Sequence, residues 1–204
     1  MTNHQSPVDE NRLLDCFAEL HNLVKIPRTG WIMAGVREPE AVSDHCYEAA
    51  MMAYVLRRYI AEPVDMGKVL TMLLFHEVGE SRLTDLPRRG SVYVKQAKGT
   101  AESAIVRDVI GDVAPELLET LEEFHRRETI EAKLAEACEE LQILFAALMY
   151  AKERNGDLTE YRLDVAKYDS YGIEIADKLA KLVGTKLDEY LGDAKYWELG
   201  YRRQ

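Results

Sequence analysis

The sequence has few cysteines, prolines and glycines. Its three cysteines, Cys16, Cys46 and Cys138, are odd in number and form no C-x-x-C pair, which argues against a disulfide framework or a zinc knuckle. Six prolines and twelve glycines in 204 residues are few for an all-β protein, which needs many turns. Alanine, leucine, glutamate and lysine are abundant instead, and these residues favour helices.

An excess of basic charge and a long apolar run are also absent. Lysine and arginine number 26 against 36 acidic residues, a net charge of −10, so we expect no broad basic face and no nucleic-acid partner. The longest apolar run is too short to span a bilayer, and residues 1–14 do not resemble a secretory signal. We therefore expect a cytoplasmic protein with no membrane partner.

Hydrophobic periodicity predicts an all-α bundle of six to eight helices. We expect Ser6, Ser43 and Asp65 to cap the first three helices, Pro27 to end the first, and residues 28–42 and 84–97 to be loops. Without a linker or repeat, one domain spanning 1–204 is expected, with a core of about 10–150 and C-terminal helices at 157–195 packed on it. The expected helices span 7–26, 43–60, 66–78, 99–110, 112–127, 128–154 and 159–191, the last interrupted near 172.

The most informative stretch is an apolar run at 69–75 that leads directly into His76 and Glu77. Burying ionisable groups beside such a run costs several kcal/mol, and a metal ion compensates by taking the imidazole and carboxylate as ligands. Glu80 lies one turn later and Asp85 in the next loop. The alternative is a helix end with a capping histidine and exposed acids.

His45 opens a second helical pattern, and the loop before it carries Arg28 and Trp31. The alternative interpretation makes His45 a hydrogen-bonded structural histidine near a helix start. Trp31 could equally pack over the first helix. Arg88, Arg89, Lys95 and Lys98 could form a basic rim beside a site or a solvated loop.

Three motifs, in this order, carry a resemblance to a known family: P-R-T-G-W at 27–31, V-x-x-P-E-A-V-S-D-H at 36–45, and F-H-E-V-G-E at 75–80 followed by Asp85. Together they resemble the HD-domain phosphohydrolase superfamily, and more narrowly its 5′-deoxynucleotidases. The resemblance covers about residues 10–150 and implies a helical HD-domain bundle. It also implies one divalent metal held by His45, His76, Glu77 and Glu139.

The resemblance departs from the family pattern at two of these ligands. The family has aspartates where this chain has Glu77 and Glu139, so each carboxylate reaches about one C–C bond further. Glu136 competes with Glu139 for the fourth position. The change is compatible with an altered but retained site or with a lost one.

The resemblance implies roles for four further residues. Glu80 and Asp85 match acids that activate water and protonate the leaving oxygen. Arg28 matches a phosphate-binding arginine, and Trp31 an aromatic that shapes the nucleoside pocket.

The hypothesis is thus a metal-dependent phosphohydrolase that removes phosphate from nucleoside 5′-monophosphates, with deoxyribonucleotides as the expected substrates. The protein is expected to form a homodimer. Mixed nitrogen and oxygen ligands suit Mn²⁺, Co²⁺, Fe²⁺, Ni²⁺ or Zn²⁺. One alternative is a degenerate HD-domain nucleotide-binding or scaffolding protein. A two-iron HD oxygenase would need more histidines between 76 and 139, where only His125 is available.

Overall fold

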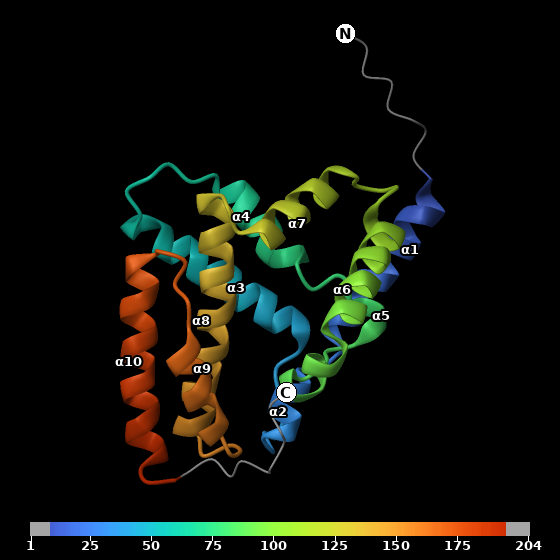
Figure 1. The fold of residues 1–204 in the computed structure, drawn as a ribbon. Helices are drawn as coiled ribbons and strands as arrows, with labels where there is room; N and C mark the ends of the chain where they lie inside the picture. Colours follow the sequence, from blue (N-terminus) through green and yellow to red (C-terminus); the bar gives the residue numbers. More distant parts are fainter. Residues whose placement is uncertain (1–8, 195–204) are drawn as a thin grey trace.

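The computed structural model describes residues 9–194, and this part of the chain is all α. Seven of its α-helices are ten residues or longer, which confirms the expected bundle (Figure 1). The expected cap at Ser6 lies outside the described residues. The α-helices are α1 Glu10–Leu20, α2 Thr29–Met33, α3 Val42–Leu56, α4 Met66–Phe75, α5 Glu80–Leu83, α6 Arg88–Ile110, α7 Glu116–Arg126, α8 Ile130–Lys152, α9 Arg162–Lys167 and α10 Glu174–Leu191.

The long helix α8 is the centre of the larger hydrophobic core. Thr129 caps it by accepting a hydrogen bond from the backbone N–H of Ala132. Helices α3, α4, α7 and α10 pack around it. Small and branched buried side chains, among them Ala49 and Ala53 on α3 and Leu134 on α8, let these helices approach closely.

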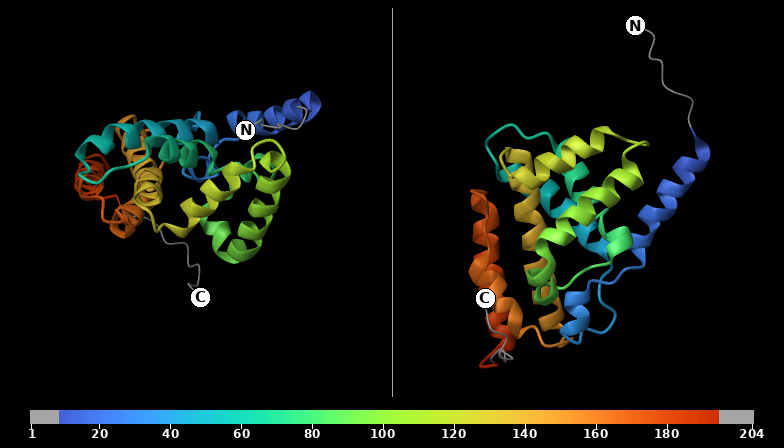
Figure 2. Two further views of the ribbon diagram at one scale, coloured as in Figure 1. Left: turned by 90° about the horizontal axis from the view of Figure 1, so that it is seen from above. Right: turned by 45° about the vertical axis from the view of Figure 1, so that its right-hand side comes forward.

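A second, smaller core lies where α1, α6 and α7 meet. Cys16, Val78, Ile110 and Leu121 are buried in it. In both views of Figure 2, α1 and α10 lie on opposite sides of the molecule. The chain passes from the larger core at Leu73 to the smaller one at Val78, so His76 and Glu77 lie at the junction between them.

The loop at 27–41 is closed at its base. The backbone N–H of Arg28 donates to the carbonyl of Glu40, and that of Val42 donates to the carbonyl of Ile26, both at 2.9 Å. This closure places Arg28 beside the start of α3. Within the loop, 29–33 forms the short helix α2, where only loop was expected.

The expected loop at 84–97 is wrong, because α6 begins at Arg88. The segment contains Pro87 and Gly90, which usually interrupt helices. Pro87 instead precedes the first helical turn, where proline loses no intrahelical hydrogen bond. Tertiary ion pairs from Arg88 and Arg89 to Glu160 attach this turn to the C-terminal region.

Other boundaries differ by about one turn. The first and second helices end earlier than expected, at Leu20 and Leu56, and each continues as a short 3₁₀ helix. The expected cap at Ser43 is wrong: Ala41 precedes α3, and its N–H donates to the carboxylate of Asp44. The Asp65 cap is confirmed, and so is the break near Gly172.

The three cysteines are buried and unpaired. Among residues 9–194, no helix has the length and apolar character that crossing a membrane requires.

Candidate metal centre and substrate pocket

Helix α4 ends one residue before the histidine–glutamate pair. The backbone N–H of His76 still donates to the Met72 carbonyl, and a tight turn follows, in which the N–H of Val78 donates to Phe75. This turn frees the two side chains from the α-helical spacing of about 100°, so both can face one site. The expected helix to Val78 was therefore three residues too long.

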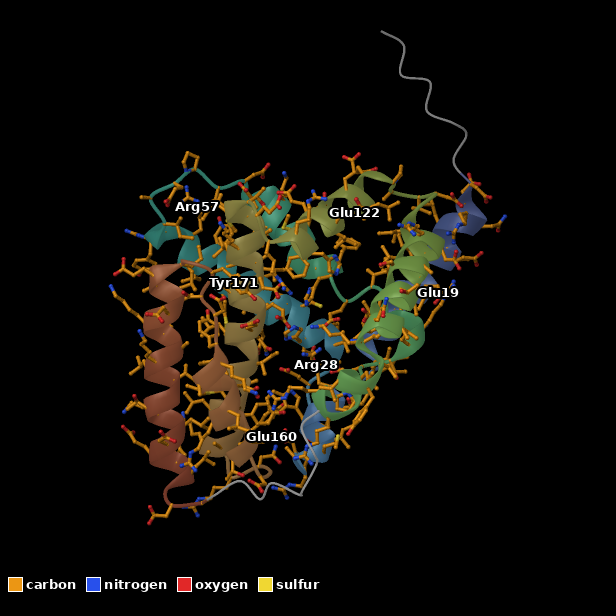
Figure 3. All side chains as sticks on the ribbon, in the orientation of Figure 1. Glu19, Arg28, Arg57, Glu122, Glu160 and Tyr171 are labelled. Carbon is orange, nitrogen blue, oxygen red and sulfur yellow. The ribbon has the colours of Figure 1, made fainter. Side chains whose placement is uncertain are left out.

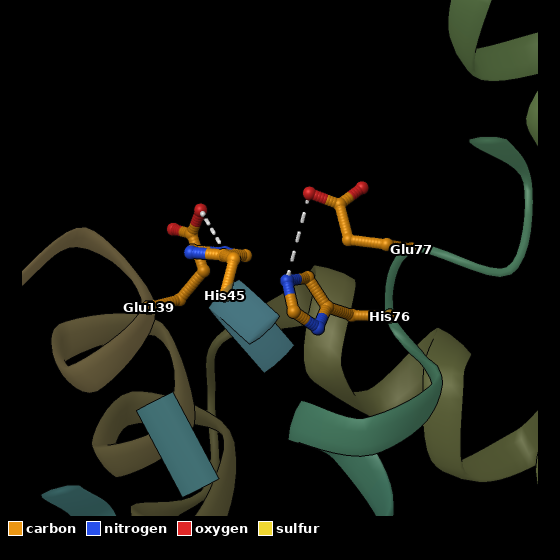
Figure 4. Close-up of side chains that lie close together, drawn as sticks. All are labelled: His45, His76, Glu77 and Glu139. Carbon is orange, nitrogen blue, oxygen red and sulfur yellow. Dashed lines mark ion pairs between the residues drawn. The ribbon is translucent and has the colours of Figure 1, made fainter. Parts of the chain in front are cut away.

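Four side chains from three segments of the chain converge at the junction of the two cores. His45 comes from α3, Glu139 from α8, and His76 and Glu77 from the turn after α4. One ligand atom from each lies within 4.8 Å of those of the others. Figure 4 shows the two imidazoles and the two carboxylates around one common space.

Each imidazole is oriented by a contact at Nδ1. His45 Nδ1 lies 2.5 Å from Gln142 Oε1, and His76 Nδ1 lies 2.9 Å from the Leu73 carbonyl oxygen. Both acceptors are oxygens, so each Nδ1 carries the proton, and in the neutral ring each Nε2 keeps its lone pair. Both Nε2 atoms are buried and have no hydrogen-bond partner among the described residues.

The distances between these atoms suit a single transition metal. His45 Nε2 lies 3.5 Å from Glu139 Oε1, and His76 Nε2 lies 3.7 Å from Glu77 Oε1. Two ligand atoms bound to one ion at about 2.1 Å are at most about 4.2 Å apart. The donor set therefore fits a metal, and a pair at the full 4.8 Å would have to close by at least about 0.6 Å.

Arg28 connects the cluster to the pocket. Its Nη1 donates to Glu77 at 2.9 Å and to Asp85 at 3.3 Å. Although burial opposes a charged carboxylate, the Arg28 guanidinium holds the pKa of Glu77 well below its usual range. In Figure 3, Arg28 lies between α8 and α6, near the middle of the molecule.

Asp85 is held by Thr29 as well as by Arg28. Its Oδ2 accepts from the backbone N–H and the hydroxyl of Thr29, both at 2.5 Å. Both carboxylate oxygens of Asp85 are thus engaged.

Glu80 is the acid with an uncommitted oxygen. Its side chain is buried, Oε1 accepts from Lys98 at 3.1 Å, and Oε2 has no partner among the described residues. Burial, followed by the charges of Glu77 and Asp85, raises the pKa of Glu80 to about 8. Its carboxyl is therefore largely protonated at neutral pH in the metal-free protein.

Glu136 is not part of the four-residue cluster and forms an ion pair with Arg127. Burial and the neighbouring Glu139 raise the pKa of Glu136 to about 7. Of the two glutamates considered for the fourth position, the geometry brings Glu139 to the histidines.

The cluster opens into a cavity of about 540 Å³. Trp31 borders it but is only 2% exposed, because Tyr161 stacks on its ring at 4.4 Å and Glu40 accepts its indole N–H. Of the expected basic rim, Lys98 contacts Glu80, while Arg88 and Arg89 pair with Glu160, labelled in Figure 3. Lys95 does not border the cavity.

Two residues at the site were not predicted from the sequence: Gln142 contacts His45, and Tyr161 lines the cavity. Lys98 was expected only as part of a basic rim, and it contacts Glu80. Gln142 lies three residues after Glu139 on α8, so the 3.6-residue period places both on one face. That spacing was the available signal.

Comparison with known proteins identifies the family of this chain. The HD-domain family profile matches residues 20–181. The chain belongs to the HD-domain family. The expected resemblance to HD-domain phosphohydrolases is confirmed, and the chain contains a histidine–glutamate cluster whose geometry fits a metal ion.

Individual relatives agree with this assignment. A 5′-deoxynucleotidase HDDC2 from Dictyostelium discoideum is 30% identical over 148 residues, which cover 69% of this chain and 78% of that protein. A crystal structure of a Pyrococcus horikoshii protein shares the fold, with a TM-score of 0.74, 24% identity and coverage of 85% and 99%. A predicted metal-dependent phosphohydrolase from Magnetospirillum magnetotacticum shares it with a TM-score of 0.66, 24% identity and coverage of 89% and 95%.

Proposed function

We propose that this HD-domain protein is a metal-dependent phosphomonoesterase that removes phosphate from nucleoside 5′-monophosphates, with deoxyribonucleotides as the expected substrates. The observation that carries the proposal is the pair of unpartnered Nε2 atoms facing two carboxylates, with an arginine between that cluster and the cavity. The relative named 5′-deoxynucleotidase supports the substrate class.

His45, His76, Glu77 and Glu139 would hold one divalent transition metal. When bound, such an ion supplies charge neutralisation for a phosphate oxygen and lowers the pKa of a water molecule. The orientation of both imidazoles by contacts within the protein supports this assignment, because pre-oriented ligands need less reorganisation.

Arg28 is assigned to the substrate phosphate. Both of its described contacts use Nη1, so Nη2 and Nε remain without partners among residues 9–194. A guanidinium can bind two phosphate oxygens with donors in one plane. Asp85, whose oxygens are already engaged, fixes the orientation of Arg28.

Glu80 is assigned to proton transfer. A carboxyl that is protonated at neutral pH can donate to the leaving nucleoside oxygen, and the ammonium of Lys98 stabilises the carboxylate that remains. Tyr161 provides the aromatic wall for the nucleoside, and Trp31 supports its ring from behind. A cavity of about 540 Å³ lies within the usual range for small-molecule sites.

The test is phosphate release from a panel of deoxyribonucleoside and ribonucleoside 5′-monophosphates with Mn²⁺, Co²⁺, Fe²⁺, Ni²⁺ or Zn²⁺ added in turn. We expect release with at least one ion, and its loss in His76→Asn. Folded wild-type protein that releases no phosphate with any ion would refute the proposal. Activity that appears only in the double variant Glu77→Asp, Glu139→Asp would favour the degenerate alternative. A homodimer and a cytoplasmic location remain predictions.

A further inference from the structure

We propose that Gln142 is a positioning residue that holds His45 in its metal-binding tautomer, and that Glu40 and Glu48 hold Gln142 in turn. The inference rests on the metal site of the proposed function, because its consequence is the availability of His45 Nε2 to a metal. Gln142 is not one of the four candidate metal ligands and does not line the substrate cavity.

The first step is the contact between two fully buried side chains. His45 and Gln142 are both 0% exposed, and His45 Nδ1 lies 2.5 Å from Gln142 Oε1. A neutral imidazole has one N–H and one lone pair. If Nδ1 faces a carbonyl oxygen, Nδ1 must carry the proton and Nε2 must keep the lone pair.

The second step is the orientation of the amide. The oxygen and nitrogen of a glutamine are distinguished by their hydrogen-bond partners rather than by shape. Gln142 Nε2 lies 2.9 Å from Glu40 Oε2 and 3.0 Å from Glu48 Oε2. A flipped amide would point its carbonyl oxygen at two carboxylates, so the pair of glutamates forces the amide oxygen towards His45.

The same chain of hydrogen bonds reaches the wall of the cavity. Glu40 uses its other oxygen, Oε1, to accept from the Trp31 indole N–H at 2.9 Å, and its backbone N–H donates to the Tyr150 hydroxyl at 3.0 Å. Glu40 is therefore fixed from three sides, and the orientation it imposes on Gln142 does not depend on a flexible surface group.

His76 provides an internal comparison. Its Nδ1 faces the backbone carbonyl of Leu73 at 2.9 Å, so the helix backbone, rather than a side chain, sets its tautomer. A substitution at Gln142 should change His45 and leave His76 unchanged.

The variant that tests the inference is Gln142→Met, which preserves approximate size and removes the acceptor. His45 would then gain by moving its proton to Nε2, where the Glu139 carboxylate lies 3.5 Å away. That proton occupies the position a metal needs. Leu141→Met, at the neighbouring buried position of α8, controls for the introduction of methionine.

Two measurements report the outcome without requiring catalysis. Long-range ¹H–¹⁵N NMR of the metal-free protein, at a pH where both rings are neutral, identifies the protonated nitrogen of each histidine. Competition with a chromogenic chelator gives the Kd for Zn²⁺. In Gln142→Met we expect His45 to change from Nδ1–H to Nε2–H and the Kd to rise about 10- to 100-fold. His76 and Leu141→Met should match the wild type.

An unchanged His45 tautomer in Gln142→Met, or an unchanged Kd, would overturn the inference. If that variant does not fold, the wild type still decides: an Nε2–H tautomer at His45 in the folded, metal-free protein refutes the argument. A wild-type protein that binds Zn²⁺ and shows the expected tautomers but releases no phosphate would refute the proposed function and leave this inference intact.

Discussion

The buried carboxyl of Glu80 should make the free energy of unfolding depend on pH, and this dependence can be measured without substrate. The carboxyl is 1% exposed, and its pKa is raised from 4.5 to about 8 by burial and by the charges of Glu77 and Asp85. Between these values the folded state binds a proton that the unfolded state has released. The stabilisation from this group is therefore complete below pH 4.5 and is lost as the pH rises through about 8. The interval spans about 3.5 pH units at about 1.4 kcal/mol each, which sets a ceiling of about 5 kcal/mol.

Glu80→Gln removes the titration and keeps the shape of the side chain. We expect the free energy of unfolding of the variant, minus that of the wild type, to increase as the pH rises from about 5 to about 9. The slope should be no steeper than about 1.4 kcal/mol per pH unit. The assay is urea unfolding followed by circular dichroism, with a chelator present because a bound cation would favour the charged carboxylate. Glu102→Gln, which removes another carboxylate paired with Lys98, gives the baseline for a loss of charge. A difference between Glu80→Gln and wild type that stays flat above pH 5 would refute the reasoning.

Three shorter predictions follow from the same contacts. Gly79→Ala should lower the free energy of unfolding by about 1–3 kcal/mol, because its Cβ would lie 2.7 Å from Glu102 Cβ; an unchanged Tm would contradict this. Glu139→Gln should weaken Zn²⁺ binding at least about 10-fold while Glu136→Gln leaves it unchanged, and equal effects in chelator competition would reject the choice of Glu139. Arg28→Lys should lower kcat/KM for a deoxyribonucleoside monophosphate by about 100-fold, since lysine lacks the planar fork; kinetics like those of the wild type would remove Arg28 from phosphate binding.

Local patterns in the sequence predicted the long helices but not every helix boundary. The apolar face of α8 follows a 3.6-residue period over 23 residues, so its existence could be read directly. The start of α6 could not, because ion pairs from Arg88 and Arg89 to Glu160, 71 or 72 residues away, support a segment that contains glycine and proline. Long-range contacts of this kind leave no trace in a local window.

The site shows the same division between local and long-range information. His45, His76 and Arg28 were accessible because motifs carry them. The spacing of Gln142 from Glu139 indicates only that the two share a face of α8. The contact of Gln142 with His45 depends on where α8 crosses α3, and the sequence alone does not specify that crossing. Tyr161 was missed for a similar reason: it reaches the pocket only through its stacking on Trp31, 130 residues earlier in the chain.

The glutamates at 77 and 139 raise the question of whether the metal site is retained or lost. In a site that no longer binds metal, burial would favour direct histidine–carboxylate hydrogen bonds of about 2.8 Å, because an unpartnered buried nitrogen is costly. The observed distances of 3.5 Å and 3.7 Å are longer than that, and both Nε2 atoms lack a partner among the described residues.

These distances favour a retained site, in which the extra methylene of each glutamate spans the space between backbone and ion. We expect metal analysis of purified protein to find about one transition-metal ion per chain, and Glu77→Asp to weaken binding, because the shorter arm no longer reaches. Metal-free protein whose crystal structure showed His45 and Glu139 in a direct hydrogen bond would instead indicate that the longer arms closed the site.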